Sequence, residues 1–324
     1  MGRSVLWLAA IALSSLLGTN GAIAQTYPTR PVTVIVPYAP GGATDLLARM
    51  IGQKLEQRLG KPFVIENRPG AGTVIAAQAA AKAAPDGYTL LMGTSTPLAI
   101  NASLHKNLPY DPSADFVPLA LVASVPFVLV VNPSLPVKSV GDLIRLAKDK
   151  PGFLSYGSSG PGSPHHLYAE LLKSMTGIEM THVPYKGSVP ALTDVVANHI
   201  PLMFVDLAPV QPMIKDGRVR ALGVSSANQV ASLPDVPPIA ATVPGFEAVA
   251  WQMLVAPANT PKDVVDTLHR ELKAILAMPE TKQQIVDLGM IPRDTPPVDE
   301  LVRYVKSEIV RWDAVVKKSG AAIE

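Results

Sequence analysis

Short apolar runs alternate with helical stripes along most of this chain. The run Val32–Val36 is rich in β-branched residues, which is typical of a buried strand. A turn rich in proline and glycine, Pro37–Gly42, follows this run. Four aliphatic residues at i, i+4 spacing then predict a helix: Leu47, Ile51, Leu55 and Leu59. The order of strand, turn and helix predicts an α/β fold.

A second unit repeats this design. A strand at Leu154–Tyr156 leads into the glycine- and serine-rich turn Gly157–Ser163. Pro164 then takes the first position of a helix that extends to about Thr176, where a missing N–H costs nothing. The repetition predicts two lobes of related construction.

The same patterns predict the remaining elements. We expect further strands at Pro62–Glu66, Tyr88–Met92, Val117–Val122, Phe127–Val131, Glu179–Val183, Pro201–Val205, Val219–Ser225 and Trp251–Ala256. We expect further helices at Thr73–Ala84, Pro97–Leu104, Ser139–Lys148, Val189–Asn198, Pro209–Lys215, Asp263–Met278, Pro279–Leu288 and Val298–Ser319. Ser139 is the expected N-cap of its helix, and Gly320 is expected to end the last one. Gly93–Thr96 is expected to form a loop at the carboxyl end of its strand.

Two positions in the chain predict crossings between the lobes. Ser124-Val125-Pro126 separates two apolar runs, and the Pro-rich stretch Leu233–Phe246 lacks any periodicity. We therefore expect one lobe from residues 25–124 and 251–324, and a second lobe from residues 125–250. Two such crossings are typical of a hinge.

The first 24 residues have the pattern of a secretory signal peptide. Arg3 precedes the apolar run Val5–Leu17, and Ala22-Ile23-Ala24 is an A-x-A cleavage site. The apolar run is shorter than the roughly 18 residues of a membrane span. We expect cleavage after Ala24 and export to the periplasm.

Composition narrows the range of partners. The formal net charge is +2, or +1 once Arg3 is removed, so nucleic acid and anionic membranes are not expected partners. The chain has no cysteine and therefore no disulfides. Aromatic residues make up only 5% of the chain, which disfavours a sugar site that stacks rings.

The two small-residue turns are the main candidates for a binding site. A strand that ends in a glycine turn before a helix leaves backbone N–H groups free, with the positive end of the helix dipole behind them. The first turn offers the N–H groups of Gly41, Gly42, Ala43 and Thr44. The second offers the N–H groups of Ser159, Gly160 and Gly162 and the hydroxyls of Ser158, Ser159 and Ser163. These donors predict a site for a small carboxylate, although each turn could also be an ordinary βα connection.

Two acidic residues fit this interpretation less simply. Asp45 lies in the first helical turn, where it could cap the helix, hold a ligand ammonium or bind a water, and Arg49 could pair with it. Asp206 ends a strand of the second lobe and poses the same alternatives. Other polar residues could line the pocket or belong to the core: Tyr38, Tyr185, Thr94 and Ser95.

Enzyme and cofactor motifs are incomplete. Gly157–Pro161 lacks the last glycine of G-x-S-x-G, and Ile75 replaces the third glycine of a G-x-G-x-x-G pattern. His165 and His166 are adjacent, so on a helix they point to different faces and do not form a metal site. We therefore expect no cofactor and no metal. The alternative is a secreted hydrolase of a carboxylate ester or amide, with Ser159 or Ser163 as nucleophile and His166 as base.

Several motifs in order resemble the Bug family of periplasmic solute receptors, the extracytoplasmic subunits of tripartite tricarboxylate transporters. The motifs are YPTRPVTVIVPYAPGGATDLLAR, IENRPGAG, PDGYTLLMGTST, LPYDPSADFVPLALVAS, YGSSGPGSPHH, HVPYKG and LPDVPP. The resemblance covers nearly all of residues 27–323. The chain departs from it at Thr73 and Ile75, where glycines are usual.

This resemblance implies a type II periplasmic-binding-protein fold that closes on its ligand like a flytrap. It implies that the loops Tyr38–Asp45 and Ser158–His166 hold a ligand carboxylate, partly through ordered water. The expected protein is a monomeric, non-catalytic receptor that delivers a dicarboxylate, tricarboxylate, acidic amino acid or aromatic acid to a membrane permease. A subunit that reports the ligand to a membrane kinase is a third alternative, because it would use the same closed lobes.

Overall fold

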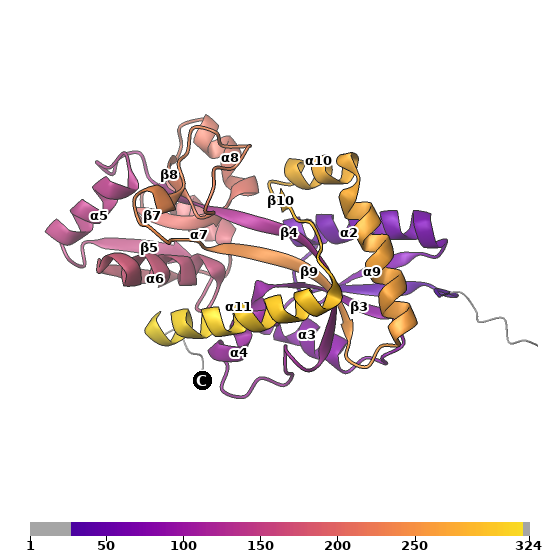
Figure 1. The fold of residues 1–324 in the computed structure, drawn as a ribbon. Coiled ribbons are helices and arrows are strands. Elements are labelled where there is room, and N and C mark those ends of the chain that lie inside the picture. The colour runs from indigo at the N-terminus through magenta and orange to yellow at the C-terminus, as the bar shows by residue number, and fades with distance from the viewer. Residues whose placement is uncertain (1–26, 320–324) are drawn as a thin grey trace, which may run out of the picture.

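Two sets of three parallel strands form the frame of the molecule. The computed structural model describes residues 27–319, and Figure 1 shows how they are arranged. In lobe 1 the set is β2 (Phe63–Asn67), β1 (Val32–Val36) and β3 (Thr89–Thr94), with β1 in the middle. In lobe 2 it is β6 (Met180–Pro184), β5 (Leu154–Ser158) and β7 (Leu202–Asp206), with β5 in the middle. Each of the two small-residue turns therefore follows the middle strand of a parallel set.

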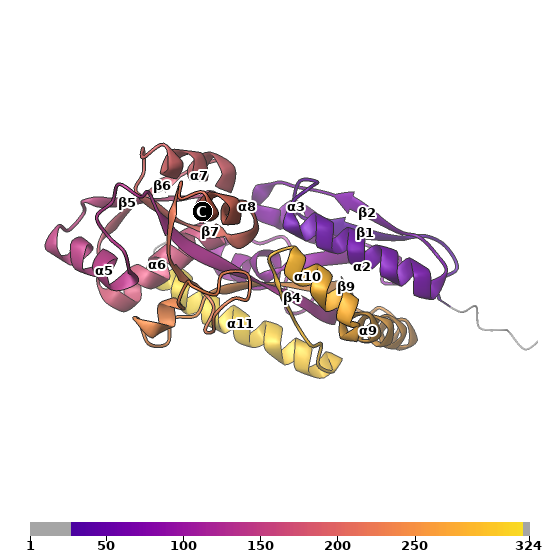
Figure 2. The ribbon, with the colours of Figure 1, turned by 90° about the horizontal axis from the view of Figure 1, so that it is seen from above.

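Helices pack around both sets of strands (Figure 2). Lobe 1 carries α2 (Ala43–Leu59), η1 (Ala71–Thr73), α3 (Val74–Ala81), η2 (Thr96–Ile100), α4 (Asn101–Leu104), α9 (Lys262–Ala277) and α10 (Pro279–Asp287). Lobe 2 carries α5 (Val140–Asp149), α6 (Pro164–Thr176), α7 (Ser188–Val196), α8 (Leu207–Lys215) and η3 (Ile239–Ala241). This alternation of strands and helices confirms the predicted α/β class.

One long strand connects the two lobes. β4 (Phe116–Val131) pairs with β9 (Val249–Pro257) as far as Pro126, and from Phe127 onward it pairs with β7 and β8 (Arg220–Val224). The strand order is β2-β1-β3-β9-β4-β7-β5-β6, and β8 and the short β10 (Ile291–Pro292) also pair with β4. Both lobes therefore belong to one hydrogen-bonded path of strands.

The sequence prediction of two separate runs around Ser124-Val125-Pro126 is wrong, because β4 passes through this segment without a break. Pro126 lies where β4 changes its partner strand, and Pro118 lies beside a shift in the pairing with β9. Proline is tolerated at such irregular positions, because the missing N–H is not required there. The segment marks the crossing between lobes without ending the strand.

The predicted end of β3 is also corrected. Gly93 and Thr94 were expected in a loop, but they belong to the strand and pair with Met253 and Gln252 of β9. β9 lies more than 150 residues away in the sequence, so the local pattern gave no sign of this pairing. The helical segment begins directly afterwards, at Ser95.

Ser225 ties the two crossing segments together. Its N–H donates to the carbonyl of Phe127, and its carbonyl accepts from the N–H of Ala248 just before β9. Its hydroxyl oxygen also accepts from the N–H of Phe127, at 2.8 Å. These bonds hold β4 and the chain entering β9 side by side at the point where both pass between lobes.

The last helix, α11 (Val298–Ser319), contacts both lobes and has the bounds that the sequence predicts. In Figure 1 it is the yellow helix that runs from lobe 1 toward α6. Trp312 of α11 stacks on Tyr168 of α6, with ring centroids 5.7 Å apart, and Asp313 accepts from Ser103 of α4 at 3.0 Å. Glu308 accepts from the indole N–H groups of both Trp251 and Trp312.

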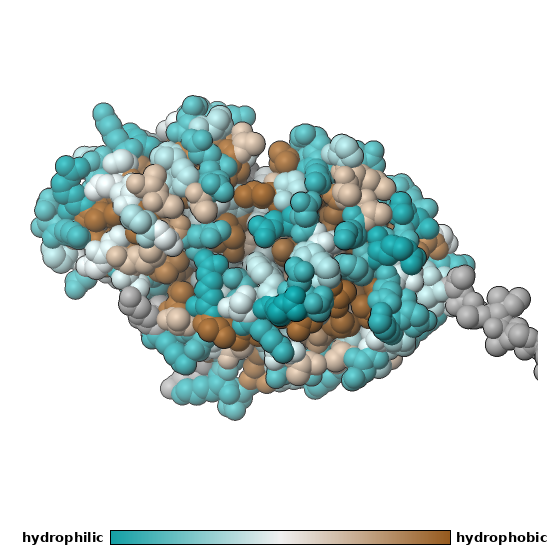
Figure 3. Space-filling view, viewed as in Figure 1, coloured by the Kyte–Doolittle hydropathy of each residue, from teal (hydrophilic) through white to brown (hydrophobic). Residues whose placement is uncertain are grey.

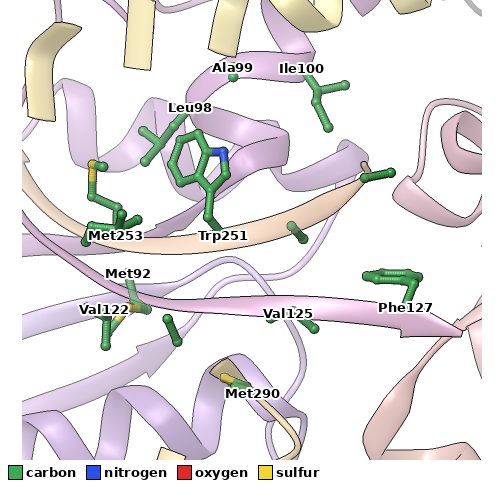
Figure 4. Close-up of a cluster of buried hydrophobic side chains, with 14 of the residues drawn as sticks. Met92, Leu98, Ala99, Ile100, Val122, Val125, Phe127, Trp251, Met253 and Met290 are labelled. Carbon is green, nitrogen blue, oxygen red and sulfur yellow. The ribbon is translucent and has the colours of Figure 1, made fainter. Parts of the chain in front are cut away.

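The apolar core follows β4 and β9 along the molecule. Figure 4 shows Val122, Val125 and Phe127 of β4 near Trp251 and Met253 of β9, each of them buried. In the parallel set of lobe 1, β1 is buried at four of its five positions, as expected for a strand covered on both faces. The strands that end at the two small-residue turns are thus largely buried in the core.

Three sequence predictions lie outside residues 27–319: the signal peptide, its cleavage after Ala24, and the helix end at Gly320. Within the described residues, none of the helices combines the length and the apolar character that crossing a membrane requires.

Candidate functional site

The first candidate loop, called loop A here (residues 37–42), joins β1 to α2. The N–H groups of Ala43 and Thr44 lie in the first turn of α2, where no intrahelical acceptor is available. The N-cap, Gly42, makes no side-chain hydrogen bond that could replace one. No bond from these two N–H groups to another described residue is present either. Gly41 and Gly42 are exposed. Loop A therefore presents free backbone donors at the positive end of a 17-residue helix.

The carboxylate of Asp45 fixes the conformation of loop A through hydrogen bonds. Its Oδ2 accepts from the N–H of Gly41 at 2.9 Å and from Nε of Arg49 at 3.0 Å, and its Oδ1 accepts from Asn67 at 2.9 Å. Asn67 also donates to the carbonyl of Tyr38, at 3.0 Å. Gly41 has a φ of 84°, a conformation that favours glycine, and it brings its N–H to the carboxylate. The predicted pair of Asp45 and Arg49 is confirmed, and the role of Asn67 was missed.

These bonds settle the charge state of Asp45. Burial raises the pKa of the Asp45 carboxyl, but the hydrogen bonds from Arg49, Gly41 and Asn67 outweigh burial, and the pKa lies below its ordinary value. The carboxylate is therefore ionised, and Arg49 compensates its charge. An anion at the N-terminus of α2 would meet a neutral pair behind the loop.

Hydroxyl groups of lobe 1 lie in loop A and at the end of β3. Tyr38 shares a 3.0 Å hydrogen bond with Thr94 at the end of β3. Burial raises the pKa of Tyr38, the hydroxyls of Thr94 and Thr96 lower it, and the negative charge of Asp206 raises it further. The hydroxyl of Ser95 is completely buried and has no hydrogen-bond partner. Thr94 thus lies beside loop A, and Asp206 of lobe 2 acts on Tyr38 across the two lobes.

The second candidate loop, called loop B here (residues 159–163), joins β5 to α6. Its own lobe uses much of its hydrogen-bonding capacity. The N–H of Gly160 donates to the Ser158 hydroxyl at 3.0 Å, and that of Gly162 donates to Nδ1 of His166 at 3.0 Å. The Ser163 hydroxyl donates to the carbonyl of Gly160 at 2.7 Å and caps α6. In this conformation, loops A and B are therefore not equivalent sets of donors.

Loop B also lies against lobe 1. Gly162 has a φ of 73°, and a Cβ on it would lie 2.5 Å from Cδ1 of Leu104 in α4. A larger residue would therefore require the Leu104 side chain to shift at this point. Figure 3 shows a notch between the lobes at the upper edge of the molecule.

His166 packs behind loop B. Its ring stacks on that of His182, with centroids 4.0 Å apart, and His182 stacks in turn on Tyr156. Burial lowers the pKa of His166 to about 4, and His182 contributes in the same direction. The neutral ring accepts from Gly162 through Nδ1, so His166 supports the loop. Whether it also contacts a ligand stays a prediction.

A chain of three polar side chains lies at the carboxyl ends of β5 and β7. The Ser159 hydroxyl is 2.9 Å from Nδ1 of His165, and Nε2 of His165 is 3.3 Å from Oδ2 of Asp206. The second contact has the distance of an ion pair but not the alignment of a hydrogen bond, so Nε2 stays without a hydrogen-bond partner. The sequence analysis considered His165 only as a possible metal ligand and did not predict this chain, because Asp206 is 41 positions away from His165 in the sequence.

The geometry does not match the hydrolase that the sequence left open as an alternative. His166 bonds through Nδ1 to the Gly162 N–H and has no hydrogen bond from its ring to either Ser159 or Ser163. The chain Ser159–His165–Asp206 joins the serine to Nδ1 and the carboxylate to Nε2, the reverse of a Ser-His-Asp triad. No cluster of three or more His, Cys, Asp or Glu residues with the arrangement of a metal site occurs within residues 27–319.

Comparisons with known proteins agree with this architecture. Residues 47–321 match the model of the tripartite tricarboxylate transporter family receptor. BugT of Bordetella pertussis is 37% identical over 303 residues, which cover 93% of each protein. The structure of R. palustris Rpa4515 with adipate has a TM-score of 0.82 and 41% identity, and covers 91% of this chain and 99% of that one.

A further solved structure is that of MatC from Rhodopseudomonas palustris with bound malate. It has a TM-score of 0.77 and 33% identity, and covers 90% of this chain and all of that one. These similarities confirm the predicted two-lobed fold and the resemblance to the Bug family. The chain belongs to the tripartite tricarboxylate transporter receptor family, whose members are periplasmic solute-binding proteins.

Proposed function

We propose that this protein captures a small carboxylate between its two lobes and delivers it to the membrane subunits of a tripartite tricarboxylate transporter. The similar proteins whose structures contain adipate and malate support a carboxylate ligand. The protein acts as a receptor and leaves its ligand chemically unchanged. It is a monomer that leaves the cytoplasm by means of a signal peptide cleaved after Ala24.

The observation that carries this proposal is the free N-terminus of α2. Ala43 and Thr44 offer unpaired N–H groups, and Arg49 neutralises the carboxylate of Asp45 beneath them. Hydrogen bonds to a charged group contribute about 1.5–3 kcal/mol each, so a few of them support micromolar binding after the cost of ordering. A carboxylate is the chemical group that this arrangement suits best.

The proposed contact residues combine loop A, the end of β3, loop B and the end of β7. They are Tyr38, Gly41, Gly42, Ala43, Thr44, Asp45, Thr94, Ser95, Ser158, Ser159, Gly160, Gly162, Ser163, His166 and Asp206. Some of these donors bond within the protein in this conformation, including the N–H groups of Gly41, Gly160 and Gly162. They contact ligand directly only if those bonds exchange, and otherwise they shape the loops.

The proposed closure moves residues 25–124 and 251–324 against residues 125–250. The crossings at Phe127 and Ala248, which Ser225 bridges, are the natural pivot because they lie between the two loops: loop A follows β1 and loop B follows β5, on opposite sides of β9 and β4 in the strand order. Closure would bring loop B, already near Leu104 of lobe 1, into its final position around the ligand.

A thermal-shift panel tests the proposed function. A ligand at 100 times its dissociation constant adds about 2.7 kcal/mol of stability, which raises Tm by about 4 °C for a chain of this size. We expect such a shift with some of a set of mono-, di- and tricarboxylates, and none with neutral polyols of the same size. Shifts with the polyols alone, or loss of the added carboxylate by turnover, would contradict the proposal.

A further inference from the structure

Asp206 occupies an unusual position for an acidic residue. It is the N-cap of α8, where an aspartate normally accepts from N–H groups of the helix, yet its side chain makes no capping bond. About a third of its side chain, 32%, remains exposed. The carboxylate is therefore not used by its own helix and remains open to a partner.

His165 holds Asp206 from one side. Its Nε2 lies 3.3 Å from Oδ2, and its Nδ1 is fixed by the Ser159 hydroxyl at 2.9 Å. The ring of His165 is 7% exposed and packs edge-on against Phe127, with centroids 5.1 Å apart. Because Nε2 is buried, the part of this pair that a small molecule can reach is the carboxylate of Asp206.

The position of Asp206 connects it with the carboxylate site. It ends β7, which pairs in parallel with β5, so it lies at the same sheet edge as loop B. Its charge also acts on Tyr38, which belongs to loop A in the other lobe. A molecule held at the N-terminus of α2 and extending toward lobe 2 would meet an exposed negative acceptor.

We propose that Asp206 accepts a hydrogen bond from the far end of the ligand, and that the site therefore selects carboxylates with a hydroxyl or ammonium group over plain dicarboxylates. This inference rests on the proposed function, since it needs a first carboxylate at loop A. A second bare carboxylate would repel Asp206, whereas a donor would satisfy it. Asp206 is thus the residue that sets specificity.

Matched ligand pairs of equal chain length test the inference by titration calorimetry. The pairs are succinate with 4-hydroxybutyrate, glutarate with 5-aminopentanoate, and adipate with 6-hydroxyhexanoate. For each chain length that fits the site, we expect the ligand with the hydroxyl or ammonium donor to bind the wild-type protein at least tenfold more tightly than the dicarboxylate does. Equal binding, or tighter binding of the dicarboxylate, would overturn the inference while leaving the proposed function intact.

The variant Asp206→Asn removes the charge at nearly constant size. We expect it to bind the dicarboxylate of a pair at least tenfold more tightly than the wild type does, and to lose the preference for the donor. Asp216→Asn is the matched control, because it makes the same change at the other, exposed end of α8. An unchanged preference in Asp206→Asn overturns the inference, and failure of every carboxylate to bind overturns the proposed function as well.

Discussion

At the residue scale, loop A depends on Asp45. This buried carboxylate gathers Gly41, Arg49 and Asn67 around two oxygens, so one side chain fixes both the turn and the start of α2. Asp45 therefore shapes the backbone donors, and whether it also contacts a ligand stays a prediction. That role differs from the ligand ammonium partner considered from the sequence, because Arg49 already neutralises its charge.

The variant Asp45→Asn should lower the free energy of unfolding by about 2 kcal/mol, because it removes a buried, charge-assisted set of bonds. Asp299→Asn is the control, since Asp299 and Arg303 form another i, i+4 pair with both side chains exposed. That change should cost less than about 0.5 kcal/mol. Denaturant unfolding measures both, and equal losses would show that burial of the Asp45 pair has no energetic consequence.

The histidines behind loop B make a prediction about pH. The pKa of His166 is lowered to about 4 and that of His182 is lowered too, so the unfolded chain binds protons at a higher pH than the folded one does. Stability should therefore fall as pH drops from 6.5 toward 4. The groups around the pair are Glu170, Lys173, Tyr156 and Ser158, which act in both directions.

His166→Asn tests this effect, because the asparagine oxygen can still accept from the Gly162 N–H while the titrating ring is gone. We expect the variant to lose less stability than the wild type between pH 6.5 and 4 in denaturant unfolding. Carboxylates with lowered pKa values lose their contribution mainly below this range, so they do not mask the difference. Identical pH profiles would contradict the assignment of His166.

At the scale of elements, the sequence predicts those parts whose structure depends on local pattern. β1, α6 and α11 have the predicted bounds, because apolar periodicity and Pro164 define them locally. The continuity of β4 and the extension of β3 to Thr94 depend on pairing with the distant β9, so the pattern could not show them.

The same distinction holds for the site. The pair of Asp45 and Arg49 could be predicted from helix spacing alone. Asn67 and His182 could not, because Asn67 reaches Asp45 from β2 and His182 reaches Ser158 from β6. The sequence also could not show that donors of loop B bond within their own lobe, because those bonds depend on side chains that fold back under the loop.

The helix α11 stabilises the molecule through one carboxylate. Glu308 accepts from two buried indole N–H groups, so Glu308→Ala leaves both without a partner and should cost about 3 kcal/mol of stability. Glu300→Ala, an exposed change on the same helix, should stay within about 0.5 kcal/mol. A loss below 1 kcal/mol in Glu308→Ala, measured by denaturant unfolding, would show that these indoles find other acceptors.

At the scale of the whole molecule, the two lobes share one path of hydrogen-bonded strands, and α11 contacts both of them. In the proposed closure, lobe 2 rotates about the crossings at Phe127 and Ala248, and the stack of Trp312 on Tyr168 restricts how far it moves from α11. The expected motion is therefore a limited closure around the loops.

Small-angle scattering measures this motion directly. A compact chain of about 300 residues has a radius of gyration of about 19 Å. We expect the protein saturated with a binding carboxylate to approach that value, and the free protein to exceed it. Scattering curves that superimpose with and without ligand would argue against closure.

The most direct test of the central claim is a titration of the wild-type protein with a carboxylate from the thermal-shift panel and with its primary amide. Charge-assisted hydrogen bonds are roughly twice as strong as neutral ones, so the backbone donors at α2 should distinguish the two ligands. Calorimetry should give one site for the carboxylate and at least tenfold weaker binding for the amide. Equal affinity for the amide would contradict the claim that the N-terminus of α2 binds an anion.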